Sequence, residues 1–433
     1  MKILLVGNGA REHIIAERIA ADAELYSVMS KNNPGISRIS KKHWICDIHD
    51  PVKIIECVKS EGIDLAFASP DAVLAAGVSD ALEKEGMLVA SPSKNASRIE
   101  WDKGFMRNLI REYKVSGGIK HQICENEDEA LKVCHEYENF VIKPLGLTGG
   151  KGVKVSGEHV NNDEEALAYI RQLLKADKKV LIEEKVEGEE FSFQAFSDGT
   201  RIAVMPPVQD HKRAFCGDFG ANTGGMGSYS TGKLLPFMES KDAEQGEKIL
   251  RETIHAMKKA GCPFKGVLYG QFMVTTNGVK IIEFNARFGD PEAMNVLSLF
   301  DGSLTDVLLS IAEGKLGNVE FMDKASVVKY LVPKGYPEKA VPDSPVSIDE
   351  KKLAEIGAKV YYASVYEKEA KILTTSSRAF GIVGVADNIA DAEHIAEKGC
   401  SYVAGPLWHR EDIGSASLIQ KRIDHMKKLK EKQ

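Results

Sequence analysis

Cysteine is scarce in this sequence, and its placement excludes two classes of protein. The 433 residues include 7 cysteines, and no two of them stand in a C-x-x-C pair. This spacing excludes zinc-finger-like sites, and scattered free thiols are typical of a reducing compartment rather than a disulfide scaffold. Long apolar runs are lacking too, since the N-terminal run is too short for a signal peptide and no stretch is long enough to span a membrane. We therefore expect a cytoplasmic protein with no membrane partner.

An excess of positive charge is also lacking. The formal net charge is −6, which leaves no basic surplus for binding nucleic acid. Apolar residues make up 43% of the chain, enough for sizeable cores, and the length predicts two to four domains. The one strongly basic segment, residues 421–432, is interpreted as a solvated C-terminal helix.

Strand-like and helix-like patterns alternate over the first hundred residues. Apolar runs at 3–6, 63–68 and 87–90 are typical of buried parallel strands, and residues 95–113 predict one long helix. This order predicts an N-terminal open parallel α/β sheet over residues 1–103. Strand patterns around glycine-rich turns predict hairpins at 140–155 and 266–284 in a central domain, residues 104–323, and a small α+β domain over residues 324–433.

A glycine turn follows the first strand. Gly7, Asn8 and Gly9 stand between that strand and a helix, where backbone amides and the helix N-terminus attract an anion, and Arg11 adds a guanidinium. A dinucleotide site would need a third glycine and an acid after the second strand, and residues 30–33 supply no acid. We favour a phosphate-bearing small molecule over NAD. A tight turn with no ligand would also need these glycines.

A second glycine-rich loop, residues 146–152, follows Lys143 and contains Lys151. It is not a Walker A motif, because neither Ser nor Thr follows the lysine and no helix comes next. We predict a flap whose amides cover ATP phosphates, with Lys143 reaching them as a point charge. An exposed hairpin tip would also be rich in glycine.

Acids cluster at residues 183–190, directly after a predicted strand. The backbone of Lys185 and Val186 could bind the edge of an adenine, and Glu190 could bind ribose hydroxyls. A charged loop after a strand is more often simply solvated, so this segment is weak by itself.

The sharpest motif is E-F-N-A-R-F-G-D-P-E, residues 283–292. Glu283 and Asn285 alternate along a strand, so both side chains face the same side, and two oxygen donors suit Mg²⁺ with substrate phosphates. Gln271 on the partner strand could face the same site. If the strand continues, Arg287 shares this face and could clamp a carboxylate or a phosphate. A strand end with surface charges is the alternative.

A basic cluster, D-H-K-R at residues 210–213, precedes another glycine-rich loop at 220–227. Together they indicate another anion site, with an ordinary surface loop as the alternative. We expect His211 to be solvated among these charges and assign it no role in proton transfer.

In this order the segments resemble the ATP-grasp superfamily, and within it the phosphoribosylamine–glycine ligase family. The resemblance covers essentially the whole chain. It rests on residues 7–13 (with Ala10 where the family has glycine), 69–71 (S-P-D for G-P-E), 210–213, 222–227, 283–292 and 410–414 (R-x-D-I-G). Each motif alone is modest, and together in the family's order they are specific.

The resemblance implies that ATP joins glycine to 5-phosphoribosylamine through glycyl phosphate, giving glycinamide ribonucleotide, ADP and phosphate in purine biosynthesis. It implies a two-part ATP-grasp domain over 104–323, with a mobile lid over about 121–190, and Mg²⁺ or Mn²⁺. With the motifs above it assigns ATP to Lys103, Lys143, Lys151, Glu183, Glu184, Val186 and Glu190. It assigns the substrates to Gly7, Asn8, Gly9, Arg11, Glu12, Asp71, Asp210, Lys212, Asn222 and Arg287. The catalytic residues are Arg287, Asp290 and Lys143, and the metal ligands are Glu283, Asn285 and, more weakly, Gln271.

Three segments depart from the family's pattern. Residues 147–152 read L-T-G-G-K-G for L-A-A-G-K-G, Gln271 stands where many relatives have a carboxylate, and residues 375–378 read T-S-S-R for a T-N-G-G-R-like turn. Another ATP-grasp ligase, such as a carboxylase or a dipeptide ligase, a regulator without catalysis, and an NAD-dependent oxidoreductase are the alternatives. The motifs at 210–213 and 222–227 favour the glycine ligase, and the retained Lys143 and metal ligands favour catalysis. A monomer and a homodimer are both compatible with the sequence.

Overall fold

The N-terminal segment is a parallel sheet with helices on its faces, in a computed structural model that describes residues 1–146 and 152–432. Its elements are β1 (Lys2–Val6), α1 (Ala10–Ala20), β2 (Glu24–Met29), α2 (Pro34–Ile39), β3 (Lys42–Ile45), α3 (Pro51–Val58), β4 (Leu65–Ala68), α4 (Asp71–Ala76), α5 (Val78–Lys84), β5 (Leu88–Val89), α6 (Lys94–Trp101) and α7 (Lys103–Glu112). The strand order is β3-β2-β1-β4-β5, and the pairings are parallel. The predicted open parallel sheet is confirmed.

The turn after β1 requires glycine. Gly7 has φ +133°, and a Cβ there would lie 2.6 Å from the Glu12 side chain and 3.0 Å from Pro70. The Glu12 carboxylate accepts the Gly9 N–H at 2.6 Å and so caps the start of α1. The chain therefore leaves the buried strand and enters the helix within three residues.

The single helix predicted over residues 95–113 is wrong, because α6 ends at Trp101 and α7 begins at Lys103. Asp102 between them has φ −125° and ψ 88°, outside the helical region. Its carboxylate accepts the Phe105 N–H at 2.9 Å. Aspartate competes well for such a capping position, and that local preference outweighed the helical spacing of the apolar residues.

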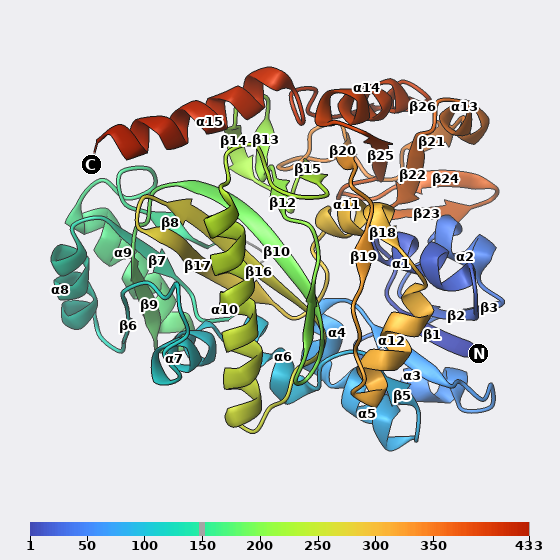
Figure 1. The fold of residues 1–433 in the computed structure, drawn as a ribbon, viewed down its shortest axis with the longest axis horizontal. Coiled ribbons are helices and arrows are strands. Elements are labelled where there is room, and N and C mark those ends of the chain that lie inside the picture. The colour runs from blue at the N-terminus through green and yellow to red at the C-terminus, as the bar shows by residue number, and fades with distance from the viewer. Residues whose placement is uncertain (147–151, 433) are drawn as a thin grey trace.

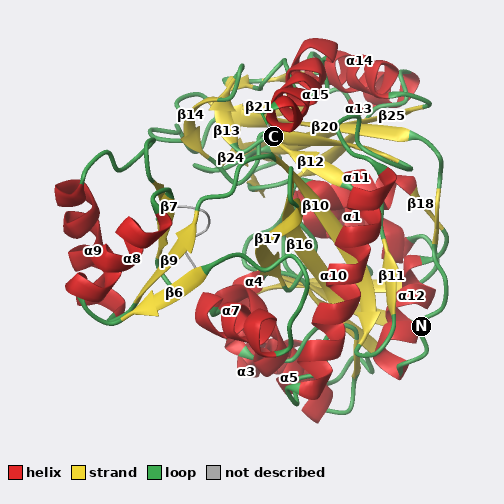
Figure 2. Cartoon of the chain, turned by 60° about the vertical axis from the view of Figure 1, so that its left-hand side comes forward, coloured by secondary structure: helices red, strands yellow, loops and turns green. Residues whose placement is uncertain are grey.

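A small subdomain follows, with its own core. It contains β6 (His121–Cys124), α8 (Glu127–Tyr137), β7 (Phe140–Lys143), β8 (Lys154–Val155), α9 (Asp163–Asp177) and β9 (Val180–Glu184). The strands are antiparallel in the order β6-β9-β7-β8, which confirms the predicted hairpin between β7 and β8. Figure 2 shows α8 and α9 on the outer side of this sheet. Ile142, Ile170 and Ile182 are fully buried between sheet and helices.

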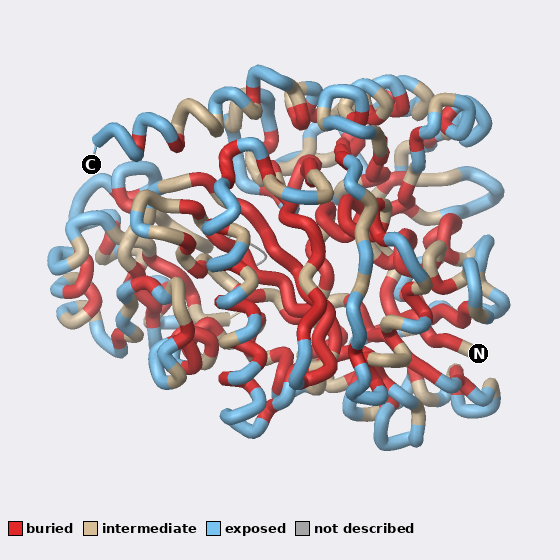
Figure 3. The backbone as a smooth tube through the Cα atoms, in the orientation of Figure 1, coloured by how far each residue is buried: buried red, intermediate tan, exposed pale blue. Residues whose placement is uncertain are grey.

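The large sheet forms the centre of the molecule. Its region contains β10 (Glu189–Asp198), β11 (Ile202–Val204), β12 (Val208–Asp210), β13 (Arg213–Phe215), β14 (Phe219–Asn222), β15 (Gly227–Thr231), α10 (Ser240–Lys259), β16 (Lys265–Thr275), β17 (Gly278–Asn285), α11 (Glu292–Leu299), β18 (Phe300–Asp301), α12 (Leu304–Glu313) and β19 (Glu320–Phe321). The tube in Figure 3 shows that the long central strands are buried along most of their length. The predicted hairpin at 266–284 is the β16–β17 pair.

The C-terminal segment continues this sheet. It contains β20 (Ala325–Pro333), β21 (Pro345–Ile348), α13 (Glu350–Glu355), β22 (Lys359–Tyr362), β23 (Val365–Lys368), β24 (Lys371–Thr374), β25 (Phe380–Ala386), α14 (Ile389–Cys400), β26 (Val403–Ala404), β27 (Leu407–Trp408) and α15 (Ala416–Glu431). The order β17-β16-β10-β12-β15-β20-β25-β22 crosses residue 323 because β15 pairs with β20. The predicted α+β character of this segment is confirmed, and Figure 1 shows it above the N-terminal sheet. Among the described residues, no helix combines the length and apolar character needed to cross a membrane.

The packing of α14 on β25 leaves no room for a side chain at Gly384. A Cβ at this position would lie 2.1 Å from the Ala392 carbonyl oxygen, whereas a Cβ at Gly317 would meet nothing within 4 Å. We expect Gly384→Ala to lower the free energy of unfolding by about 1–3 kcal/mol, the usual cost of overpacking. Urea unfolding followed by circular dichroism measures this, with Gly317→Ala as the matched control. Equal stability of the two variants would contradict the packing described here.

Candidate active site

One cleft collects most of the predicted site residues. Its volume is ≈ 1460 Å³, and it is bounded by the small subdomain, the large sheet, the N-terminal segment and α15. The predicted residues that line it are Arg11, Asp71, Lys103, Lys143, Glu183, Glu184, Val186, Glu190, Asp210, Lys212, Asn222, Glu283, Asn285, Arg287 and Asp290. Gly7, Asn8, Gly9, Glu12 and Gln271 are not among its lining residues, and Lys151 lies outside the described part of the chain.

A buried carboxylate holds two cations at the inner end of the small subdomain. Glu183 Oε1 lies 2.5 Å from Arg107 Nε, and Glu183 Oε2 lies 2.7 Å from Lys143 Nζ. Burial alone would raise the pKa of Glu183, but the two cations dominate and lower it to about 2. Glu183 is therefore ionised and fully paired, and it orients Lys143, which lines the cleft.

The same arginine fixes the strand that carries the predicted metal ligands. Arg107 donates to the carbonyl oxygens of Ile281 at 3.1 Å and Ile282 at 2.8 Å. These residues directly precede Glu283 on β17. One guanidinium on α7 thus ties β9 of the small subdomain to β17 of the large sheet.

Glu283 and Asn285 share one face of β17, as predicted from their alternation. Both are partly exposed and line the cleft, while Phe284 between them is buried. Among the described residues, no group forms a hydrogen bond or an ion pair with the Glu283 carboxylate. Asn285 Oδ1 accepts from Arg287 at 3.2 Å. Over residues 1–146 and 152–432, no group of three or more Asp, Glu, His or Cys side chains is arranged to hold a metal ion. A carboxylate and an amide oxygen fit a divalent cation whose other ligands are phosphates and waters.

Gln271 lies opposite Glu283 in the β16–β17 ladder. Its carbonyl oxygen accepts the Tyr269 hydroxyl, and its amide donates to Glu190 Oε2 at 2.9 Å. Lys212 Nζ contacts the same Glu190 oxygen at 3.1 Å. Gln271 thus orients Glu190 in this arrangement, and its weaker assignment as a metal ligand stays a prediction.

Arg287 and Asp290 line the same cleft. Arg287 pairs at 2.9 Å with Glu100, a buried residue of α6 that the sequence analysis missed because no local motif surrounds it. Asp290 Oδ2 lies 3.1 Å from Arg378 Nη2, and its other oxygen accepts the Tyr330 hydroxyl. Arg378 ends the unusual turn at 375–378, which was the available signal for it.

Polar groups of the glycine turn in the N-terminal segment form hydrogen bonds with other groups of the protein. Glu12 accepts from Gly9 and from the Ser69 hydroxyl, and Asn8 Oδ1 accepts from Ser30. Arg11 alone among the turn's predicted residues reaches the cleft lining. Its guanidinium is held by Glu12 at 2.6 Å and by the Phe288 carbonyl oxygen at 3.0 Å.

The expectation that His211 is solvated is wrong. Its exposed fraction is 2%, and neither ring nitrogen has a hydrogen-bond partner among the described residues. Burial, followed by the cations Arg410 and Arg422, lowers its pKa to about 3. The imidazole is therefore neutral at pH 7. The neighbouring Asp210 has its pKa raised by burial and by the Glu292 carboxylate.

The C-terminal helix is not simply solvated, which corrects the interpretation of residues 421–432. One face of α15 lines the cleft with Lys421, Arg422, His425 and Lys428. Their spacing is that of one helical face, a signal present in the sequence. The same polar residues would suit a solvated helix surface, so their spacing alone did not distinguish a cleft wall from a solvated face.

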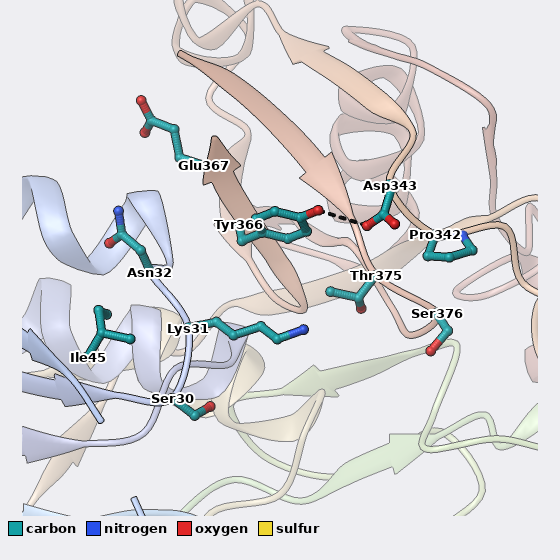
Figure 4. A pocket seen from close by; sticks show the side chains of 10 residues that line it. All are labelled: Ser30, Lys31, Asn32, Ile45, Pro342, Asp343, Tyr366, Glu367, Thr375 and Ser376. Atoms are coloured by element: carbon teal, nitrogen blue, oxygen red, sulfur yellow. Dashed lines mark hydrogen bonds between the residues drawn. The ribbon is translucent and has the colours of Figure 1, made fainter. Parts of the chain in front are cut away.

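A smaller cavity lies apart from these residues, between the N-terminal segment and the C-terminal strands. Its volume is ≈ 420 Å³, and in Figure 4 Lys31 and Asn32 face Tyr366 and Asp343 across it. The Tyr366 hydroxyl donates to Asp343 Oδ1 at 2.7 Å. None of the predicted site residues lines this cavity, so the large cleft is the candidate active site.

Known protein families match the chain over most of its length. Three family models match it: phosphoribosylglycinamide synthetase N domain at residues 1–100, ATP-grasp (A) domain at 101–293 and C domain at 326–416. A phosphoribosylamine–glycine ligase of Methanobrevibacter smithii is 47% identical over 435 aligned positions, covering 99% of this chain and 100% of the relative.

Solved structures agree on the fold. A phosphoribosylamine–glycine ligase from Thermotoga maritima superimposes with a TM-score of 0.82 at 24% identity, covering 95% of this chain and 100% of that one. A biotin carboxylase from Campylobacter jejuni, solved as a β,γ-ATP complex, gives a TM-score of 0.74 at 13% identity, covering 98% and 96%. At these identities the likeness concerns the fold alone.

The pairing of Glu183 predicts an acid-dependent stability. Its folded pKa of about 2 lies below its ordinary value of 4.5, so its contribution is complete above about pH 5 and is lost as the pH falls toward 2. We expect the stability difference between wild type and Glu183→Gln to shrink by about 2 kcal/mol between pH 6 and pH 3. Urea unfolding at both pH values measures it, with the exposed Glu56→Gln as control. A difference independent of pH would contradict the paired, ionised state.

Proposed function

The chain belongs to the phosphoribosylglycinamide synthetase family, and from this premise we propose that its central cleft joins glycine to 5-phosphoribosylamine with ATP. The products are glycinamide ribonucleotide, ADP and phosphate, and the reaction belongs to purine biosynthesis. The observation that supports the proposal is the cleft itself, which is lined by Lys143, Glu283, Asn285 and Arg287.

The carboxylate of glycine needs activation, because its leaving group in a direct reaction with an amine would be oxide. In the first step a carboxylate oxygen attacks the γ-phosphorus, the bond to the β-phosphate oxygen breaks, and glycyl phosphate and ADP form. Lys143, oriented by Glu183, and Lys103 place positive charge at the nucleotide end of the cleft. Glu283 and Asn285 would hold Mg²⁺ or Mn²⁺, which when bound supplies neutralising charge for the β- and γ-phosphates.

In the second step the amine nitrogen attacks the acyl carbon, phosphate leaves and the nitrogen loses a proton. Glu100 and Asn285 fix the Arg287 guanidinium. In this proposal it holds the glycine carboxylate or the departing phosphate. Asp290, held by Arg378 and Tyr330, lines the same cleft. Arg11 and Asp71 line the part of the cleft formed by the N-terminal segment, which we assign to phosphoribosylamine.

The adenine and ribose belong at the other end of the same cleft in this proposal. Lys185 and Val186 supply backbone groups for the base edge, and Glu190 accepts ribose hydroxyls. We retain the division of the chain at residues 103 and 323 and the lid over about 121–190 as proposals. We also place the reaction in the cytoplasm.

The proposed reaction predicts that ADP release depends on both substrates. We expect the full chain with ATP and Mg²⁺ to release ADP only when glycine and freshly prepared phosphoribosylamine are both present, with glycinamide ribonucleotide as the product. A coupled ADP assay and mass spectrometry of the product measure this, and EDTA should stop the release. ADP release with another amino acid in place of glycine, and none with glycine, would refute the substrate assignment.

The proposed metal site predicts a loss of turnover when Glu283 is replaced. We expect Glu283→Ala to lower kcat by more than about 100-fold, since even an outer partner of a metal ligand costs about 10–100-fold. The midpoint of thermal unfolding should stay unchanged, and binding of Mn²⁺ with ATP, measured by electron paramagnetic resonance, should weaken. Glu56→Ala, an exposed glutamate remote from the cleft, serves as control. Undiminished turnover with Mg²⁺ would refute this metal assignment.

A further inference from the structure

The C-terminal helix α15 is built into the body of the protein. In Figure 1 it runs across the top of the molecule, from the C-terminal segment toward the side that carries the small subdomain. Leu418, Met426 and Leu429 are buried along one side, at helical spacing. Arg422 and His425 lie on the same face of the helix as these apolar residues, and both line the cleft. Apolar packing of this face thus holds the two polar side chains at the cleft wall.

Arg422 joins two carboxylates at the cleft wall. Its Nη2 lies 2.6 Å from Asp218 Oδ2, and its Nε lies 3.5 Å from Glu189 Oε2. Asp218 also pairs at 3.2 Å with the fully buried Arg410. His425, one helical turn further along α15, places Nδ1 at 2.6 Å from the other oxygen of Glu189.

Glu189 therefore depends on α15 for the guanidinium of Arg422 and for the imidazole of His425. It is 4% exposed, and an isolated carboxylate at such a place is strongly disfavoured. Its remaining contact, at 3.4 Å, is the side-chain amide of Gln209, which donates at 3.2 Å to the Glu190 carbonyl as well. Without Arg422 and His425 the carboxylate would have to take up a proton or move toward water, and the start of β10 would move with it.

Glu190 is the next residue on β10 and points the other way. Its carboxylate contacts Lys212 and Gln271 inside the cleft, where the proposed function puts the ribose of ATP. Because successive side chains of a strand alternate, the backbone that positions Glu189 against α15 also positions Glu190 toward the cleft. A shift of about 1 Å at such a group is enough to weaken binding markedly.

We propose that α15 is a wall of the nucleotide site and that Arg422 and His425 are positioning residues, which act through Glu189 to hold Glu190 toward the nucleotide. The inference rests on the proposed binding of ATP in this cleft. It assigns to the last helix a role in nucleotide affinity, separate from the transfer of the glycyl group. Among the described residues, the side-chain contacts of Arg287 are to Glu100, Asn285 and Phe288, and none of them comes from α15.

The test is calorimetric titration of the full-length protein with the non-hydrolysable analogue AMP-PNP in the presence of MgCl₂. We expect Arg422→Ala to weaken binding about tenfold, since each ~1.4 kcal/mol corresponds to a factor of ten in Kd. Arg422→Lys should recover only part of this, because an ammonium cannot bridge both carboxylates with fixed geometry. Lys427→Ala on the same helix, whose side chain is exposed and does not line the cleft, is the matched control and should bind as wild type.

Steady-state kinetics separates positioning from a general structural role. Arg422→Ala should raise the KM for ATP by a similar factor and leave the KM for glycine unchanged. In the Glu189→Gln background, Arg422→Ala should weaken binding less than it does in the wild type, since both changes act on the same contact. An equal rise in both KM values, or full additivity of the two substitutions, would overturn the proposal.

Three further outcomes are decisive. If Arg422→Ala unfolds, His425→Gln takes its place, and wild-type affinity for AMP-PNP in that variant would overturn the proposal. If wild-type protein fails to bind AMP-PNP, the proposed function fails first. If the wild type binds AMP-PNP and both variants bind it equally well, the proposed function stands and the role of α15 is refuted.

Discussion

The site depends on one buried ion network, in which Glu183 lies between Arg107 and Lys143. The carboxylate comes from the small subdomain, and the guanidinium comes from α7, outside that sheet. Through two carbonyl oxygens the guanidinium also holds β17 directly ahead of Glu283. Three parts of the molecule thus meet at one charge cluster, which also holds Lys143 at the cleft. Loss of a single partner would leave a buried charge uncompensated.

The cleft has the same design at three other positions, where the group that faces it is fixed by a partner behind it. Glu100 stands behind Arg287, Arg378 behind Asp290, and Gln271 behind Glu190. The α15 helix extends this pattern to the outer wall. Because the partners come from distant parts of the chain, the site forms only when the large sheet and the segments around it are assembled together.

Much of the fold could be predicted because its signals are local. Buried parallel strands read as continuous apolar runs, and the hairpin at β16 and β17 follows from alternation around a glycine turn. The common face of Glu283 and Asn285 also follows from alternation. The break at Asp102 was missed, because an N-cap competes with helical periodicity over a single residue. The continuation of the large sheet past residue 323 was missed because strand pairing between distant segments leaves no local mark.

The sequence by itself determined the classes of element, the motifs and the family whose chemistry they imply. The tertiary structure alone decided which partner each charged group has. Glu183 is paired with Arg107 rather than free for a nucleotide, His211 is buried rather than solvated, and α15 is a wall of the cleft rather than a solvated tail. The physical reason is that the state of a charged side chain depends on burial and on neighbours within a few ångströms. Those neighbours are brought together by long-range folding and are far apart along the chain.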